Sequence, residues 1–346
     1  MKAVLVFALA ACSSPVPHPD APTSHWSEGT MLPLPRLEPG VTALGQRVVV
    51  LGGFDTDLMA GLDITKRVDV YDPAADPALD PSVGSASNPW SQLPDAPVQW
   101  THIQLASVGT TLYLLGGLEG QTYVARGDSF ALDTQDMCPD KCPQWRPLAA
   151  MPAGMERGSA AVVVSGARIY LLGGAGTNTA LATNLYYDTI SDTWAQLMPD
   201  LPAARSHPAG MRRADGTLVV AGGLATLDSS SQAGDTWQLL PTGIVSMPGM
   251  WVPGTMMPAN DARGGCAYGQ IQGQLVCAGG EAGPSAYKSV LSYDPLADTW
   301  TELEPMPDSR AGAQGAAVGD RLFIPGGARQ LVFEPLDTLL VYTANP

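Results

Sequence analysis

The heptapeptide RIYLLGG, residues 168–174, decides the fold, because five other stretches of the chain repeat its pattern. Each stretch is a short apolar run that ends in Gly-Gly: RVVVLGG (47–53), TLYLLGG (111–117), TLVVAGG (217–223), QLVCAGG (274–280) and RLFIPGG (321–327). The first glycines of successive pairs are 47 to 64 residues apart, and self-similarity at such periods is typical of propellers and solenoids. The chain is therefore predicted to contain six similar units.

Each unit contains more than one strand. A second apolar stretch and a tight turn precede the Gly-Gly run, as in AAVVVSG (160–166), which predicts a hairpin. A third strand with an aromatic residue follows most pairs: VDVYD (68–72), SFALD (129–133), LYYD (185–188), DTWQLL (235–240) and LSYD (291–294). A tryptophan then marks a fourth strand, at Trp90, Trp145, Trp194, Trp251 and Trp300.

The order of apolar strand, Gly-Gly, aromatic strand and tryptophan resembles the kelch repeat over residues 24–346. The resemblance implies an all-β fold, a six-bladed β-propeller with four antiparallel strands in each blade. One blade cannot bury both faces alone, whereas a ring of blades packs sheet on sheet. The sixth unit ends at TLLVY (338–342) without a tryptophan, and Trp26 precedes the first unit. We therefore expect the N-terminal segment to close the ring as the outer strand of the last blade.

Composition limits the partners of this domain. The 346 residues include 18 Lys and Arg against 33 Asp and Glu, a formal net charge of −15. Nucleic-acid binding depends on Lys and Arg that neutralise phosphates, so DNA and RNA are poor candidates.

The first residues, MKAVLVFALAA (1–11), resemble a bacterial lipoprotein signal, because Leu9, Ala10, Ala11 and Cys12 match its lipobox position for position. The resemblance implies a signal peptide over residues 1–11 and lipidation of Cys12. It also implies export, with the chain anchored to the outer membrane and facing the periplasm or the cell surface. The Pro-rich residues 12–23 read as a flexible tether, and the apolar run is too short to span a bilayer. A free cysteine after a chance apolar stretch is the alternative.

The other four cysteines suit an oxidising compartment. Cys138 and Cys142 share the short segment CPDKC, which favours a disulfide over zinc, because the chain has only four histidines to complete a metal site. The sequence predicts no metal site and no cofactor. Cys266 and Cys277 fall diagonally across one hairpin, at the upper limit of distance for a bridge, so their pairing stays open.

Arginine recurs just before the first strand of five blades, at Arg36, Arg157, Arg205, Arg263 and Arg310, and the second blade has His102 nearby. In the kelch domains of ubiquitin-ligase adaptors, arginines at this position line the ligand-binding face. That resemblance implies an anion-recognising rim on a monomeric binding module for a protein, peptide or glycan. The alternative is structural, with each guanidinium bonded to neighbouring loop carbonyls or an adjacent aspartate.

Two classes of kelch-like enzyme can be compared with these residues. Copper radical oxidases need a Tyr-Cys crosslink and paired histidine ligands. Only His102 and His207 fall within the predicted blades, so the chain has too few histidines and cysteines for that class. Sialic-acid mutarotases are six-bladed kelch enzymes in which a glutamate just after a blade's glycine accepts a proton. Glu281 in GGEAGP occupies such a place, and a carboxyl with a raised pKa is suited to that role. An enzyme that uses Glu281 as base and the arginines as a clamp for an anionic sugar is therefore the alternative to the binding module.

Overall fold

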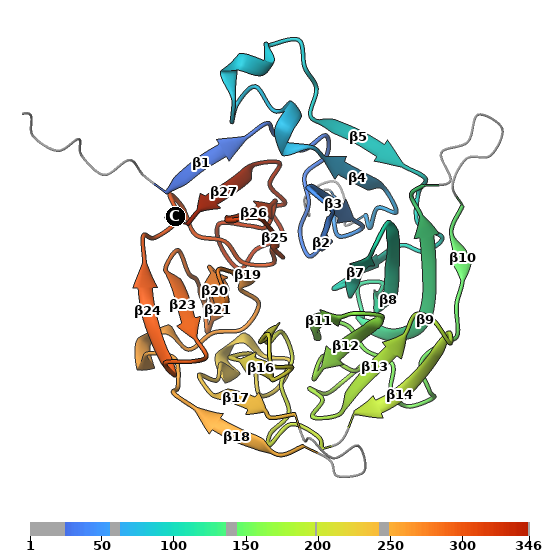
Figure 1. Cartoon of the computed structure of the whole chain (residues 1–346), viewed down its shortest axis with the longest axis vertical. Helices are drawn as coiled ribbons and strands as arrows, with labels where there is room; N and C mark the ends of the chain where they lie inside the picture. Colours follow the sequence, from blue (N-terminus) through green and yellow to red (C-terminus); the bar gives the residue numbers. More distant parts are fainter. Residues whose placement is uncertain (1–24, 56–62, 136–143, 198, 242–248, 345–346) are drawn as a thin grey trace, which may run out of the picture.

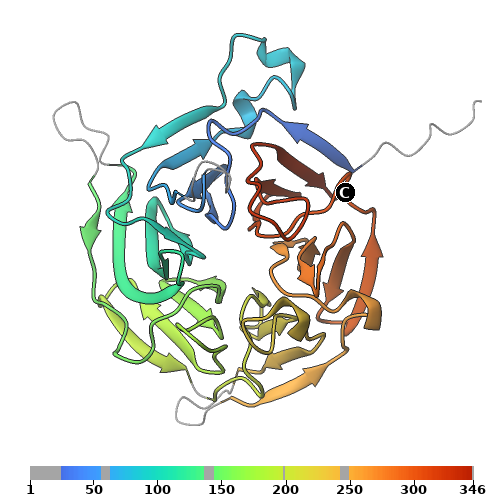
Figure 2. The same ribbon diagram turned by 180° about the vertical axis from the view of Figure 1, so that it is seen from behind.

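The structure is a computed structural model that describes residues 25–55, 63–135, 144–197, 199–241 and 249–344. Its main sheets form a closed ring of six antiparallel blades (Figure 1), and Figure 2 shows the same ring from its opposite face. The six-bladed, all-β propeller is therefore confirmed. In these ranges, no helix is both long and apolar enough to cross a bilayer. The predictions for Cys12, Cys138 and Cys142 lie outside the described residues.

The blades follow one another along the chain. Blade 1 contains β2 (Gly40–Leu44), β3 (Arg47–Leu51), β4 (Val68–Tyr71) and β5 (Trp90–Leu93). Blade 2 contains β6 (Trp100–Thr101), β7 (Leu105–Val108), β8 (Thr111–Glu119), β9 (Val124–Asp133) and β10 (Arg146–Pro147). Blade 3 contains β11 (Ala161–Ser165), β12 (Arg168–Leu172), β13 (Asn184–Asp188) and β14 (Thr193–Leu197).

The second half of the ring repeats this plan. Blade 4 contains β15 (Ala209–Arg212), β16 (Leu218–Ala221), β17 (Thr236–Leu239) and β18 (Trp251–Gly254). Blade 5 contains β19 (Ala267–Ile271), β20 (Gln274–Ala278), β23 (Val290–Asp294) and β24 (Thr299–Leu303), with a small hairpin of β21 (Glu281–Ala282) and β22 (Ser285–Ala286). Blade 6 contains β25 (Ala316–Val318), β26 (Arg321–Pro325), β27 (Leu339–Thr343) and β1 (Trp26–Gly29).

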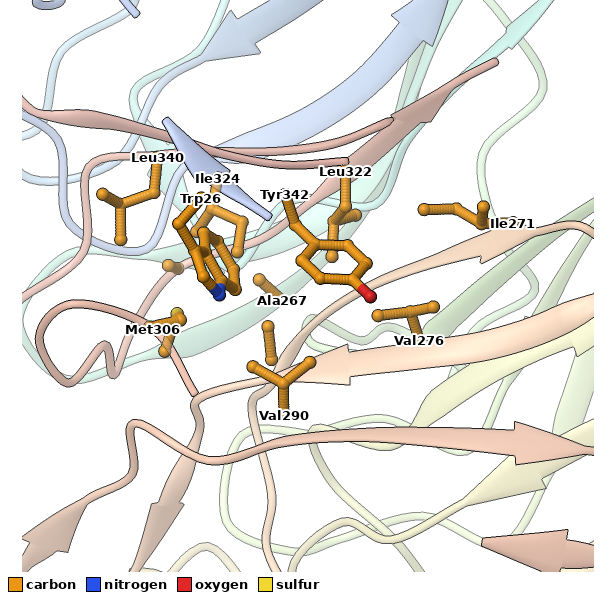
Figure 3. Close-up of a cluster of buried hydrophobic side chains, with 12 residues drawn as sticks. Trp26, Ala267, Ile271, Val276, Val290, Met306, Leu322, Ile324, Leu340 and Tyr342 are labelled. Carbon is orange, nitrogen blue, oxygen red and sulfur yellow. The ribbon is translucent and has the colours of Figure 1, made fainter. Parts of the chain in front are cut away.

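The N-terminal strand closes the ring, as the sequence predicted. Strand β1 pairs antiparallel with β27, and Trp26 lies opposite Tyr342. Both rings belong to a buried cluster that joins blades 5 and 6, with Met306 and Ile324 beside them (Figure 3). The last blade is therefore built from both ends of the described chain, which removes the exposed strand edge that an open ring would leave.

Neighbouring blades are also joined by their tryptophans. The indole N–H of Trp194 in blade 3 donates to the carbonyl oxygen of Ala149, just after the outer strand of blade 2, at 2.9 Å. The remaining pairs of this kind are Trp26 with Glu304, Trp90 with Thr30, Trp145 with Pro94, Trp251 with Pro199 and Trp300 with Thr255. The repeated tryptophan thus buries all or part of its ring while satisfying its one polar group.

The Gly-Gly pairs lie where one blade crosses the next. A Cβ atom on Gly173 would meet the carbonyl oxygen of Arg205 at 2.6 Å, and the residue has φ of +63°. The N–H of Gly174 donates to the same carbonyl oxygen at 2.8 Å. Only glycine permits both this backbone conformation and this approach, which explains why the pair repeats.

The two faces of the ring differ in their connections. On one, which we call the turn face, short hairpins join the first two strands of each blade, at residues 45–46, 109–110, 166–167, 213–217, 272–273 and 319–320. The opposite face, which we call the loop face, carries residues 52–55, 63–67, 120–123, 173–183, 222–235, 279–289 and 326–338. The chain also enters each inner strand from the loop face, so any site at that end of the channel is built by these segments.

Candidate functional site at the channel mouth

A ring of six residues surrounds the mouth of the channel on the loop face, one at the entry to each blade. Each has positive φ, between 51° and 62°. We call them the mouth ring: Glu38, His102, Ser159, His207, Gly265 and Gly312. In five blades the ring residue follows the repeated arginine by two positions.

Backbone hydrogen bonds link the mouth ring from blade to blade. The N–H of His102 donates to the carbonyl oxygen of Glu38 at 3.1 Å, and the N–H of Ser159 donates to that of His102 at 3.0 Å. The N–H of His207 donates in turn to Ser159 at 3.0 Å, and the N–H of Gly265 to His207 at 2.9 Å. The N–H of Glu38 donates to Gly312 at 2.7 Å, which continues the chain of bonds across the closure. The backbone at the mouth is therefore fixed from several directions at once.

Three side chains of the mouth ring converge, although they come from blades 1, 2 and 4. One donor atom each from Glu38, His102 and His207 lies within 4.8 Å of the other two. The His102 Nε2 atom is 3.4 Å from the Glu38 Oε2 atom, and the two imidazole rings meet edge to face with centroids 5.2 Å apart. Blades that are not neighbours can bring side chains together in this way only near the propeller axis.

Hydroxyl groups contact the ring nitrogens of both imidazoles. The Ser206 hydroxyl donates to the carbonyl oxygen of Thr226 at 2.8 Å, so its oxygen accepts from His207 Nδ1 at 3.2 Å. His207 then carries hydrogen on Nδ1, and its Nε2 atom accepts a hydrogen bond from the Ser159 hydroxyl at 2.9 Å. The Thr101 hydroxyl lies 3.4 Å from the carbonyl oxygen of Leu118 and 2.8 Å from His102 Nδ1. The contacts of His102 fit either tautomer, because the Thr101 hydroxyl can donate to Nδ1 or accept from it.

Burial controls the ionisation of this cluster. It lowers the pKa of His102 to about 3 and that of His207 to about 4, because a charged imidazole loses its hydration there. It raises the pKa of the Glu38 carboxyl. Burial, together with the neighbouring charge of Glu38, also raises the pKa of Glu281 to about 7. Both histidines are therefore neutral near pH 7, and Glu281 titrates near that pH.

Behind the mouth ring, the channel is lined by small apolar residues and by polar ones such as Thr42, Arg212 and Gln270. The cavity of about 340 Å³ is lined by small residues of the inner strands, among them Val41, Ala106, Gly210 and Ala317. Tyr268 spans part of it, because its hydroxyl accepts a hydrogen bond from the Val162 N–H, two blades away, at 2.8 Å.

Aromatic residues flank one side of the mouth. Tyr123 and Phe333 each meet the buried ring of Phe54 edge to face, with centroids 6.4 and 5.3 Å apart. Tyr123 also meets the His102 ring, at 5.5 Å. Tyr123 and Phe333 are half-buried, so they offer apolar surface beside the histidine cluster.

The repeated arginines do not form the predicted binding rim, and this expectation is corrected. All five arginine side chains are buried, with exposed fractions between 0% and 5%. They are Arg36, Arg157, Arg205, Arg263 and Arg310. The guanidinium of Arg157 donates to the carbonyl oxygens of Met155, Gly173 and Thr183 at 2.6 to 3.0 Å.

The other four arginines pair with aspartates. These pairs are Arg36 with Asp69, Arg205 with Asp235, Arg263 with Asp261 and Arg310 with Asp308. Buried charges need such partners, so the structural alternative describes these arginines.

Three other predicted residues lie near the mouth or the inner strands. Glu281 begins β21, pairs through its backbone with Gly264, and its side chain is partly buried. Cys266 and Cys277 form a disulfide with Cα atoms 5.5 Å apart. Tyr268 lies opposite Cys277 in the register, so the cysteines are diagonal as expected, and the hairpin brings them closer than the diagonal distance assumed.

Of the converging side chains, the sequence analysis singled out only His102. Glu38 and His207 were missed, although a signal was present. The residue two positions after each repeated arginine is Glu38, Ser159, His207, Gly265 or Gly312, and residues at equivalent repeat positions must lie around one axis. Reading the repeat two residues further would have found the mouth ring.

Known proteins show the same repeat. A family model described as the "KLHDC2/KLHL20/DRC7 Kelch-repeats domain" matches residues 101–327. The chain belongs to the kelch-repeat family. This kelch chain is 29% identical over 323 residues to "Kelch-like protein terF" of Aspergillus terreus (strain NIH 2624 / FGSC A1156), a match that covers 85% of the chain and 61% of terF. It is 25% identical over 222 residues to "Kelch-like protein 25" of Xenopus tropicalis, which covers 63% of the chain and 35% of that protein.

The kelch chain thus spans about three-fifths of the length of terF and a smaller part of Kelch-like protein 25. Among solved structures, "Structure of YjhT" matches with a TM-score of 0.69 and covers 91% of this chain and 99% of that one. At 14% sequence identity, this similarity concerns the fold.

Proposed function

We propose that this kelch propeller is a binding module that holds a protein or peptide on its loop face, around the channel mouth. The observation that carries the proposal is the exposed apolar surface there. Leu227 and Val332 are 41% and 42% exposed on loop-face segments, and Phe333 and Tyr123 lie half-buried on the same face. Apolar side chains exposed on a polar surface are typical of interaction sites.

The acidic surface indicates the kind of partner. With a formal net charge of −15, the domain attracts basic surfaces and repels acidic ones. We therefore propose a partner whose contact region combines basic residues with an apolar anchor. The burial of the five repeated arginines supports this choice, because they present no exposed guanidinium groups that could bind an anionic ligand.

Panning a random-peptide display library against the full chain tests the proposal. Selected peptides should bind at least about tenfold more weakly to Leu227→Asp and Val332→Asp, because each change places a charge in the apolar contact. Ile190→Asp is the matched control, since Ile190 is 85% exposed in the turn between β13 and β14 on the turn face. Peptides that respond to Ile190→Asp and not to the loop-face variants would contradict the proposal. Selective capture of glycans by an array, without any peptide, would also contradict it.

We further propose that the protein is exported as a monomer and held at the outer membrane by a lipid on Cys12. The lipobox residues 9–12 support this, and so does the Cys266–Cys277 disulfide, because disulfides persist in oxidising compartments. Mass spectrometry of the N-terminal peptide should find a diacylated Cys12. Alkylation without reductant should leave Cys138 and Cys142 unmodified. An unprocessed Met1, or both cysteines alkylated, would contradict this localisation.

A second candidate function is catalysis of sugar ring-opening or epimerisation, with Glu281 as the base. Its pKa of about 7 at the channel mouth favours that role. The buried arginines leave no clamp for an anionic sugar, and Glu38 would repel one, so an uncharged sugar suits this site better. Exchange between sugar anomers, measured by NMR, should accelerate with the wild-type protein and return to the uncatalysed rate with Glu281→Gln. Equal rates for the two proteins would exclude this role for Glu281.

A further inference from the structure

We propose that Glu38, His102 and His207 bind a divalent transition-metal ion at the mouth of the channel. The inference is independent of the proposed partner binding. The sequence predicted no metal site, because the number of histidines alone was too small. The fold places Glu38 beside two of these histidines, which changes that expectation.

The first argument is the convergence of donor atoms. The Ser206 hydroxyl holds hydrogen on His207 Nδ1, so His207 Nε2 carries a lone pair, which the Ser159 hydroxyl contacts at 2.9 Å and a metal ion would take in its place. His102 Nε2 lies 3.4 Å from a Glu38 carboxylate oxygen. Among the described residues, no N–H or O–H group other than that of His102 is placed to donate a hydrogen bond to that carboxylate. The carboxylate and the two Nε2 atoms thus converge, and with His102 in its Nδ1–H tautomer a cation between them would be stabilised.

The second argument is that the protein holds these donors ready. Metal-bound histidine usually donates its other ring N–H to an oxygen that fixes the ring. His207 makes that bond to the Ser206 hydroxyl, and the Thr101 hydroxyl lies 2.8 Å from His102 Nδ1, where it can accept the same bond. The backbone of all three residues is fixed by the hydrogen bonds of the mouth ring. Such rigid support is what precise metal sites require.

The third argument concerns distance and ion type. Tetrahedral ligands at about 2.0 to 2.1 Å from zinc are about 3.4 Å apart, the spacing that His102 Nε2 and Glu38 Oε2 already have. All three donors lie within 4.8 Å, so small side-chain rotations would bring His207 into place. Two imidazoles and one carboxylate suit zinc and its transition-metal neighbours, whereas calcium and magnesium prefer oxygen ligands.

The fourth argument is the space around the donors. Gly265 has no atom closer than 3.9 Å to where a Cβ atom would lie, so that side of the mouth ring is not filled by a side chain. Three protein ligands and an accessible position describe an open site, which can hold water or a ligand atom.

Zinc titration of the full chain tests the site. Free thiols are first alkylated without reductant, which removes competition from Cys12, Cys138 and Cys142, and the protein is dialysed against EDTA. Calorimetry should then show one zinc ion per chain, and zinc should raise the melting temperature. Cobalt(II) should give visible absorbance in the same stoichiometry.

The variants distinguish this site from other metal-binding groups. His102→Gln and His207→Gln should each weaken zinc binding by about 100-fold or more, and Ser206→Ala by about tenfold, through loss of the fixed ring orientation. His25→Gln is the matched control, since His25 lies at the outer edge of blade 6, and it should bind zinc like the wild type.

The proposal fails if the wild-type chain binds no stoichiometric zinc, or if both histidine variants bind it unchanged. Thermal unfolding in EDTA checks that each variant is folded. If a histidine variant does not fold, Glu38→Gln, which keeps the shape of the side chain, takes its place. Unchanged zinc affinity in Glu38→Gln would then overturn the proposal.

Discussion

Arg157 illustrates how a charged residue can recur in most blades without facing solvent. Its side chain reaches across the blade and bonds to the carbonyls of Gly173 and Thr183, next to the Gly-Gly pair. Gly173 follows the end of β12 and Thr183 precedes the start of β13, so both carbonyl groups lie just outside the strand pairing. The arginine therefore completes the backbone hydrogen bonding of the blade. Its charge is buried and does not face a ligand.

Removing this side chain should destabilise the fold. Arg157→Ala leaves buried carbonyl oxygens without donors and should lower the free energy of unfolding by about 2 to 3 kcal/mol. Arg168→Ala is the control from the same blade, because that side chain is 50% exposed and should change stability by less than about 1 kcal/mol. Thermal or urea unfolding compares the two. Equal stability losses would show that Arg157 does not have the structural role assigned to it.

Glu281 should make stability depend on pH. Its folded pKa of about 7 lies above the usual value near 4.3, so the folded state holds a proton that the unfolded chain has lost. Stability from this group therefore falls as pH rises from about 4.5 to 7 and stays lower above pH 7. Glu281→Gln should stabilise the protein at pH 8 by about 1 to 2 kcal/mol and have little effect near pH 4.5.

Melting curves in EDTA across this pH range measure the difference. Glu302→Gln on the exposed surface of β24 is the control and should show no comparable trend. A Glu281→Gln protein that follows the wild type at every pH would mean that the carboxyl is not buried in solution.

At the scale of single residues, the sequence was a poor guide to the site. It identified the repeated arginines correctly but assigned them to the surface, because a repeat position alone does not say whether a side chain points into its blade or out of it. His102 was found only as the exception in blade 2. The left-handed conformation two residues after each arginine directs the functional side chains to the axis, and the sequence analysis stopped at the arginines themselves.

At the scale of elements, the sequence was far more informative. The apolar runs before Gly-Gly, the aromatic third strands and the tryptophans each mark an observed strand, although Trp145 lies just before β10. Each feature serves a packing need that recurs from blade to blade. The closing strand was predictable for the same reason, since a tryptophan missing at one end of the repeat was present at the other. The short pairing of β6 with β8 was not predicted, because blade 2 departs from the arginine pattern there.

Strand β1 should be needed for stability, whereas the residues before it should not. Deletion of residues 24–30 removes the partner of β27 and the Trp26 ring from a buried cluster. We expect a fall of about 3 kcal/mol or more, since loss of a buried tryptophan alone costs about 3 to 5 kcal/mol. Deletion of residues 13–23 is the control and should leave the melting temperature nearly unchanged. The same melting temperature for both truncations would contradict the closure by β1.

The disulfide should stabilise the hairpin of β19 and β20. The bridge closes a loop with a sequence separation of 11, so replacement of both Cys266 and Cys277 by alanine should cost about 2 to 3 kcal/mol through the entropy of the unfolded chain. Reductant should lower the melting temperature of the wild type and leave that of the double variant unchanged. If reductant has no effect on the wild type, the bridge does not form in solution.

At the scale of the whole molecule, stability comes from contacts between blades as much as within them. The buried clusters combine residues of adjacent blades, as when Tyr71 of blade 1 packs on Phe323 of blade 6. Each blade is therefore held by two neighbours, and the closing strand makes the last interface similar to the others. The ring should unfold as one cooperative unit, without a stable fragment of a few blades.

The mouth ring separates the chemistry of the axis from the stability of the propeller. Its members are joined through backbone atoms, so a change of side chain at one position leaves these links in place. Evolution, or a protein engineer, can therefore change what the axis binds without redesigning a blade. Gly265 is the most permissive position, because its surroundings are open and its backbone conformation is shared by the two histidines. Other kelch propellers with this ring can be compared by reading six letters, one for each blade, as a short code for the chemistry at the centre.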